Sequence, residues 1–80
     1  MSPINPSQRL QLSVLPPVSS QEQFSQWLGT TPDTVRGWIE NDTIPHVKIG
    51  RQRFVNVVAL VESMQEGKTI FARGDFNDAD

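Results

Sequence analysis

Three cationic side chains lie within a short stretch of the sequence that has the pattern of a β-hairpin. Residues 43–56 contain Lys48, Arg51 and Arg53 and no carboxylate. Val47 and Ile49 alternate with Lys48, as in a half-buried strand, and apolar residues resume after Gly50, where a tight turn would fall. Ammonium and guanidinium groups bind phosphate strongly. The chemistry indicated here is therefore the binding of a polyanion.

The basic residues of this hairpin are expected to differ in role. Alternation would place Arg51 and Arg53 on one face and Gln52 on the other. Either arginine could enter a narrow minor groove of DNA, where the negative potential is strongest. Lys48 would point away from Val47 and is expected to meet a phosphate. The alternative for all of them is a solvated hairpin tip.

A first helix is predicted to begin after Ser20, which forms a capping-box pattern with Gln23. Apolar residues then recur with helical spacing and should pack in the core, and Gly29 should end the helix in a left-handed conformation. The buried stripe of this helix is predicted to contain Phe24, Trp27 and Leu28.

A second helix should begin at Thr31-Pro32, because threonine is a good N-cap and proline is favoured at the first helical position. Its buried side is predicted to carry Val35, Trp38 and Ile39, and its end lies near residues 41–42. Only two residues separate it from the first helix, which is typical of a helix-turn-helix.

A third helix should follow the hairpin, with Asn56 as its cap and a stop at Gly67. Its buried stripe is predicted to contain Val57, Leu60, Val61 and Met64.

The second helix supplies further candidate contacts with a nucleic acid. Thr31 and Thr34 would approach the backbone or a base edge at the helix N-terminus, although Thr31 can also be a plain cap. Arg36 could read guanine or bind phosphate, or it could pair with Glu40 one turn on. Gly37 would permit close approach of DNA or reflect packing alone.

Three carboxylates on or just after this helix should repel phosphate and so act against non-specific binding. These are Asp33, Glu40 and Asp42.

The order of these features resembles that of the excisionase and MerR-type winged helix-turn-helix domains, especially the small phage excisionases and the Cox- or AlpA-like regulators. The resemblance covers residues 19–66 and includes the Gly turn, the Thr-x-x-Thr-Val helix, the "IP" pair and "VKIGRQRF". It implies an α+β fold with the order helix, helix, β-hairpin, helix.

The resemblance also implies a function. The second helix would enter the major groove of double-stranded DNA, and the hairpin wing would touch the minor groove or the backbone. Several members are recombination directionality factors, which bind repeated sites, bend DNA and help an integrase to excise a prophage. Some repress a phage promoter, so a dedicated transcriptional regulator is the alternative. No cofactor is implied.

The 80 residues are expected to form one domain with two flanking segments. Residues 1–18 would be a flexible arm, in which Leu10, Leu12 and Val14 alternate as in a short strand or docking arm. Residues 19–67 would form the DNA-binding domain. The tail at 68–80 would either contact the next protomer on DNA or be disordered.

The composition limits the other possibilities. The net charge of -2 argues against DNA binding by the protein as a whole and keeps a protein–protein adaptor open, but four of the seven basic residues fall within residues 36–53. So few cations predict weak binding by one copy and hence self-association on DNA. There is no cysteine, one histidine and no phosphate-binding loop, so we expect no enzyme. No signal peptide or membrane span is visible, and we expect a cytoplasmic protein.

Overall fold

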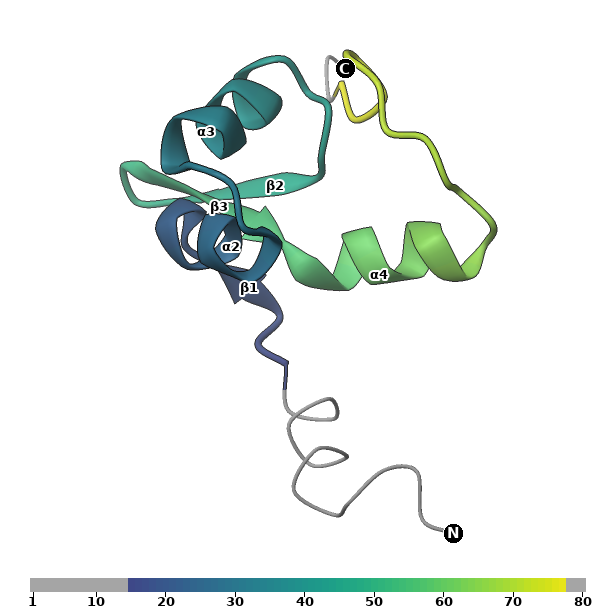
Figure 1. The fold of residues 1–80 in the computed structure, drawn as a ribbon, viewed down its shortest axis with the longest axis horizontal. Coiled ribbons are helices and arrows are strands. Elements are labelled where there is room, and N and C mark those ends of the chain that lie inside the picture. The colour runs from purple at the N-terminus through teal and green to yellow at the C-terminus, as the bar shows by residue number, and fades with distance from the viewer. Residues whose placement is uncertain (1–14, 78–80) are drawn as a thin grey trace, which may run out of the picture.

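A computed structural model describes residues 15–77 of the chain. Three helices and a small antiparallel sheet follow one another in an α+β arrangement (Figure 1). The elements are β1 (Val18–Ser19), α2 (Gln21–Leu28), α3 (Pro32–Glu40), β2 (His46–Ile49), β3 (Gln52–Asn56) and α4 (Val57–Gln65). The strand order is β1-β3-β2. The predicted α+β class is confirmed, whereas β1 was not predicted.

The two helices of the predicted helix-turn-helix begin at their expected caps. The Ser20 hydroxyl accepts a hydrogen bond from the Gln23 amide at 3.0 Å, and the Thr31 hydroxyl accepts one from the Thr34 amide at 3.2 Å. Gly29 ends α2 with φ +73°, a conformation that glycine adopts without steric cost. These short-range signals determine where α2 and α3 begin and how closely they follow each other.

The hydrophobic core lies between α2, α3 and the sheet. Its fully or nearly buried members are Phe24, Val35, Ile39, Ile44, Val55 and Val57, and Trp38, Leu60 and Val61 pack against them. Three predicted core residues are instead exposed: Trp27, Leu28 and Met64. The reason is the course of α4, which leaves the core after its first turns, so no described element covers the C-terminal part of α2 (Figure 1).

The register of the hairpin decides which of its faces is buried. Residues paired directly across an antiparallel sheet place their side chains on the same face. Val55 is fully buried and pairs with His46. Arg53, two residues before Val55 on the same strand, pairs with Lys48. The inward face therefore carries the two cations. Val47 and Ile49, expected on the apolar side of a half-buried strand, lie on the opposite face, where Val47 is half-buried and Ile49, next to the turn, is exposed.

The chain before α2 is tied to the fold from Pro17 onward. The Pro17 carbonyl accepts hydrogen bonds from the amides of Val57 and Val58 at 2.9 and 3.3 Å, and Val18 pairs with Asn56 in the sheet. The last residues of the predicted flexible arm thus belong to the folded unit. The alternating Leu10, Leu12 and Val14 lie outside the described residues.

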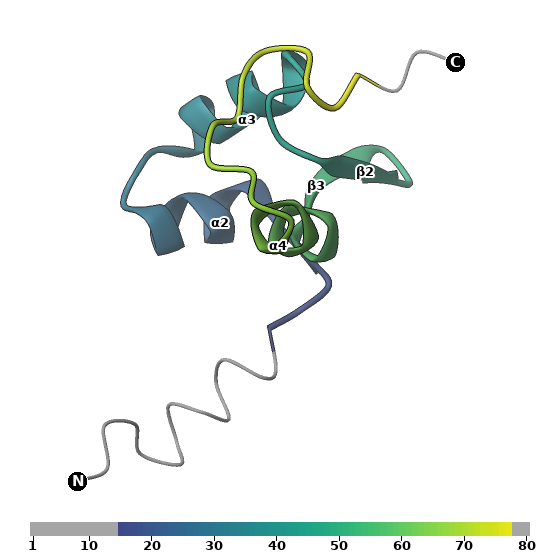
Figure 2. The same ribbon diagram turned by 90° about the vertical axis from the view of Figure 1, so that its right-hand side faces the viewer.

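The C-terminal segment folds back from α4 toward the end of α3 (Figures 1 and 2). The Gly74 amide donates to the Asn41 carbonyl at 2.8 Å, and the Phe76 amide donates to the Asp42 carbonyl at 2.9 Å. Arg73 adds a bond to the Asn41 side chain at 2.8 Å. Residues 68–77 are therefore docked on their own chain, and they contain no strand.

A small cluster of side chains holds this C-terminal segment in shape. The rings of Phe71 and Phe76 stack at 5.9 Å, and the Lys68 ammonium lies over both. The same ammonium pairs with Asp75 at 2.8 Å, and the Ala72 amide donates to that carboxylate at 2.8 Å. These two hydrogen bonds, that from Lys68 first, hold the pKa of Asp75 below its ordinary value.

Candidate nucleic-acid interface

A cleft of about 480 Å³ lies between α3 and the tip of the hairpin. It brings together Arg36 of α3 with Arg51 and Arg53 of the hairpin, although Arg36 lies fifteen and seventeen positions before them in the chain. The remaining lining residues are Ser20, Gln21, Ile39, Glu40, Gln52 and Phe54. Three arginines thus share this cleft with one carboxylate.

The turn of the hairpin sets the position of Arg51. Ile49 pairs with Gln52, so the loop consists of Gly50 and Arg51 alone. Gly50 has φ +64°, as the first central position of a type II′ turn requires. Arg51 therefore lies in the turn rather than on a strand face. The predicted alternation of Arg51, Gln52 and Arg53 along a strand is wrong in this respect, because β3 begins at Gln52.

Arg53 and Lys48 occupy the next pair of positions in the hairpin. They are direct cross-strand partners and both are exposed, so two cations stand side by side on the inward-facing side of the projecting tip. The Gln21 side-chain amide donates to the Arg53 carbonyl at 3.0 Å. This bond ties β3 to the first turn of α2 and fixes the hairpin against the helices.

Arg36 is paired, but not with the residue considered from the sequence. Its guanidinium donates to the Asp33 carboxylate at 2.8 Å, three residues earlier, rather than to Glu40. The two side chains are 59% and 86% exposed, so the pair is solvated and contributes little to stability. A phosphate could replace Asp33 as the partner of Arg36 at low cost.

Two hydroxyls mark the N-terminus of α3. The Oγ1 atoms of Thr31 and Thr34 lie 2.9 Å apart, and both side chains are exposed. They do not line the cleft. They stand on the same helix as Arg36, so a ligand lying along α3 could reach them, whereas one held only in the cleft could not.

Gly37 has no packing partner that would require a glycine. A Cβ atom added at this position would meet no described atom within 4 Å outside its own helix. A glycine inside a helix costs about 1 kcal/mol relative to alanine. The described fold therefore offers no internal compensation for this cost.

Comparison with known proteins links the chain to one phage protein. It is 47% identical over 64 residues to the "10.1 kDa protein" of Pseudomonas phage Pf1, and the matched region covers 76% of this chain and 71% of that relative. This chain belongs to the family of that phage protein. No family model matches the sequence, and no solved structure matches it.

Among residues 15–77, no group of three histidine, aspartate or glutamate side chains could hold a metal ion. Within the same residues, no helix has the length and apolar character needed to cross a membrane. The three arginines that line the cleft give it the chemistry to bind an anionic group.

The sequence did not identify two contributors to the cleft. Gln21 and Ser20 reach it from the start of α2, and the bond from Gln21 to Arg53 joins residues 32 positions apart. No pattern among neighbouring residues in the sequence predicts a contact between residues so far apart. Glu40 was considered as a partner of Arg36 and as a carboxylate that repels phosphate, but its place in the cleft depends on where the hairpin packs.

Proposed function

We propose that this protein binds double-stranded DNA as a winged helix-turn-helix, with α3 as the recognition helix and the β2–β3 hairpin as the wing. The observation that carries the proposal is the convergence of Arg36, Arg51 and Arg53 on one cleft in a chain whose net charge is -2. Binding to DNA depends on local neutralisation of phosphates rather than on the charge of the whole protein.

The dimensions of the elements suit this mode of binding. An α-helix with its side chains is about 10–12 Å across, so the major groove, roughly 12 Å wide, admits one helix, and the nine residues of α3 would extend about 13 Å along it. The hairpin tip projects beyond α2 and α3 (Figure 1). With α3 in the groove, Arg51 at the tip would reach an adjacent minor groove or a phosphate, and Thr31 and Thr34 would face the DNA backbone at the helix N-terminus.

The biological role we propose is that of an excisionase, a recombination directionality factor of a phage or integrated element. The phage origin of the relative supports such a setting. The protein would bind repeated sites cooperatively, bend the DNA and assist an integrase, and it would need no cofactor because the recombinase carries out the chemistry. A dedicated transcriptional regulator would make the same contacts with DNA. A protein–protein adaptor would not need to bind DNA.

Duplex binding measured as a function of salt tests the DNA-binding proposal. Arg51→Ala should weaken binding and reduce the slope of log affinity against log salt by about 1, because one phosphate contact is lost. Arg73→Ala is the matched control, since it also removes one arginine but lies outside the cleft, bonded to Asn41. Equal affinities and slopes for the wild type and Arg51→Ala would contradict the proposed interface.

An excision assay with the cognate integrase separates the two DNA-binding roles. An excisionase should stimulate excision in proportion to occupancy of sites beside the attachment site, and Arg51→Ala should lose both together. Footprinting on DNA flanking the gene would locate these sites. Protection confined to a promoter, without any effect on excision, would favour the transcriptional regulator.

A further inference from the structure

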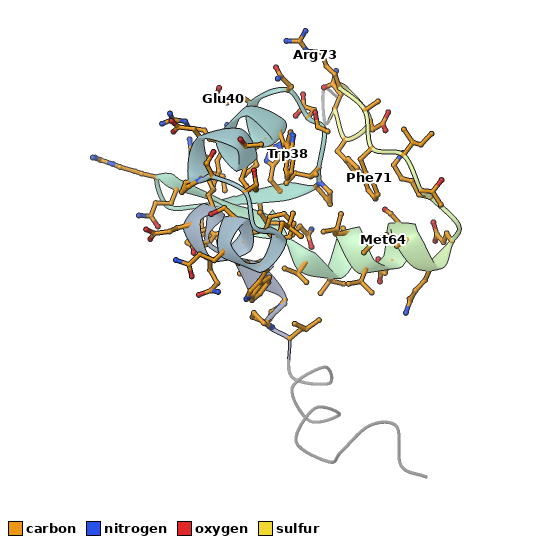
Figure 3. All side chains as sticks on the ribbon, in the orientation of Figure 1. Trp38, Glu40, Met64, Phe71 and Arg73 are labelled. Carbon is orange, nitrogen blue, oxygen red and sulfur yellow. The ribbon has the colours of Figure 1, made fainter. Side chains whose placement is uncertain are left out.

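A second concave surface lies away from the cationic cleft and is almost entirely apolar. This apolar groove has a volume of about 470 Å³ and runs between α2, α3, α4 and the C-terminal segment. Its lining residues are Leu15, Phe24, Trp27, Leu28, Trp38, Thr43, Ile44, Val57, Leu60, Met64 and Phe71. Figure 3 shows Trp38, Met64 and Phe71 coming from three different elements around this space. None of the described residues that line it is charged.

Three large apolar side chains on the rim of the apolar groove are exposed. Trp27, Leu28 and Met64 are 44%, 54% and 49% exposed. A concave, contiguous apolar surface of this kind is typical of a groove that binds a ligand or another segment of protein. A segment that covers it must carry apolar side chains and must lie close enough to contact the groove.

Leu15 shows that the N-terminal part of the chain lies close to the apolar groove. It is the first described residue, it lines the apolar groove, and it is 47% exposed. It also borders a smaller apolar hollow with Val58 and Val61 of α4. The chain therefore enters the described fold at the groove itself, and the five residues before Leu15 can extend at most about 17 Å from it.

The chemistry of those five residues matches the groove. Leu10, Leu12 and Val14 alternate with polar residues, so an extended chain presents all three on one side. No charged residue lies between Arg9 and Glu22. Because the segment is covalently attached at the groove wall, its effective concentration there exceeds that of any free partner at ordinary protein concentrations.

We propose that residues 10–14 lie in the apolar groove of their own chain, with Leu10 and Leu12 over the indole of Trp27. The apolar groove and the cationic cleft share no lining residue. A docked arm thus leaves the cleft open. The inference stands independently of the DNA-binding proposal, and its test needs no DNA.

The test compares two variants of the full chain by tryptophan fluorescence. Leu10→Ser/Leu12→Ser removes the apolar side chains, and Gln11→Ser/Ser13→Gln alters only the alternate polar positions. Burial of two leucines is worth at least a tenfold shift in the ratio of docked to free arm. The leucine variant should therefore show a red-shifted emission and faster acrylamide quenching, whereas the polar variant should match the wild type.

A second measurement uses the wild-type protein alone. Nuclear Overhauser effects should connect the methyl groups of Leu10 or Leu12 with the Trp27 indole, and they should persist on dilution. Their absence, or equal quenching in both variants, overturns the proposal. Contacts that weaken on dilution, together with a concentration-dependent mass, would also overturn it and assign the groove to a second copy.

Discussion

Arg53 stands directly across the hairpin from Lys48, on the same sheet face as the fully buried Val55. The core therefore dictates where these cations lie. Because Val55 faces inward, Arg53, two positions earlier, and its partner Lys48 must lie on the same face of the sheet. Both lie nearer the turn than the core does. Packing of one apolar residue thus places two positive charges on one face of the hairpin, and of these two Arg53 lines the cleft.

Two like charges directly opposite each other in a sheet are destabilising. We expect Lys48→Gln to raise the free energy of unfolding by a few tenths of a kcal/mol at low salt. The gain should vanish at high salt, where the repulsion in the wild type is screened. Thermal unfolding at two ionic strengths measures both values. A gain that is independent of salt would mean that repulsion between Lys48 and Arg53 is not its cause.

Gly37 offers a test of whether α3 approaches a ligand closely. Because nothing in the described fold surrounds the position, Gly37→Ala should stabilise the protein by up to about 1 kcal/mol. The added methyl group should also weaken duplex binding if DNA lies against this part of α3. Denaturant unfolding and a duplex titration measure the two effects.

Gly29→Ala is the contrasting control for that substitution. Gly29 also has open space around its Cβ position, but its φ of +73° disfavours a side chain. This variant should lose about 1–2 kcal/mol of stability. A Gly37→Ala protein that is stabilised and binds duplex unchanged would show that DNA does not lie against Gly37.

The parts of the fold that follow from short-range rules were predictable. Ser20, Thr31 and Asn56 cap their helices as expected, since each hydroxyl or amide oxygen accepts from an amide three residues on. Gly29 and Gly50 likewise adopt the positive φ values their positions require. Such signals depend on neighbours in the sequence, so one chain suffices to recognise them.

The buried face of the hairpin could not be derived in the same way. Phe54 and Val55 are both apolar and adjacent, so alternation is ambiguous by one residue, and a shift of one residue reverses every side chain. The prediction followed Val47 and Ile49, whereas the core selected Val55. The partner of Arg36 was ambiguous for a similar reason, since Asp33 and Glu40 both lie one helical turn away.

The position of the C-terminal segment on the fold could not be predicted from its own sequence. Its amides at Gly74 and Phe76 bond to carbonyls more than thirty residues earlier, at the end of α3. Those carbonyls lack helical partners, but any segment with free amides could satisfy them. Only the assembled fold shows which one does.

The carboxylate of Asp33 should act as a brake on DNA binding. In the free protein this carboxylate forms an ion pair with the Arg36 guanidinium at 2.8 Å, and in the complex it would repel phosphate. Asp33→Asn should raise duplex affinity several-fold and lower stability by about 0.3–1 kcal/mol, because a negative charge is lost from the first turn of α3. Fluorescence anisotropy with a labelled duplex gives the affinity.

Glu62→Gln provides the matched control for the change of charge. It removes one negative charge from α4, at a residue that does not line the cleft. An equal rise in affinity for both variants would point to net charge alone. A rise specific to Asp33→Asn would show that the pair with Arg36 limits binding.

The docking of the C-terminal segment should depend on pH through Asp75. Its pKa is lowered in the folded protein by Lys68 and the Ala72 amide, so the stabilisation is complete above the ordinary value of 3.8 and is lost as the pH falls through the lower, folded value. The amide chemical shifts of Gly74 and Phe76 should therefore titrate in that acidic window. Asp75→Asn should abolish this titration and loosen the segment at neutral pH, whereas Asp78→Asn, which removes a charge from the same tail, should leave the titration in place. A titration that survives in Asp75→Asn would assign it to another carboxylate and remove Asp75 as the anchor of the segment.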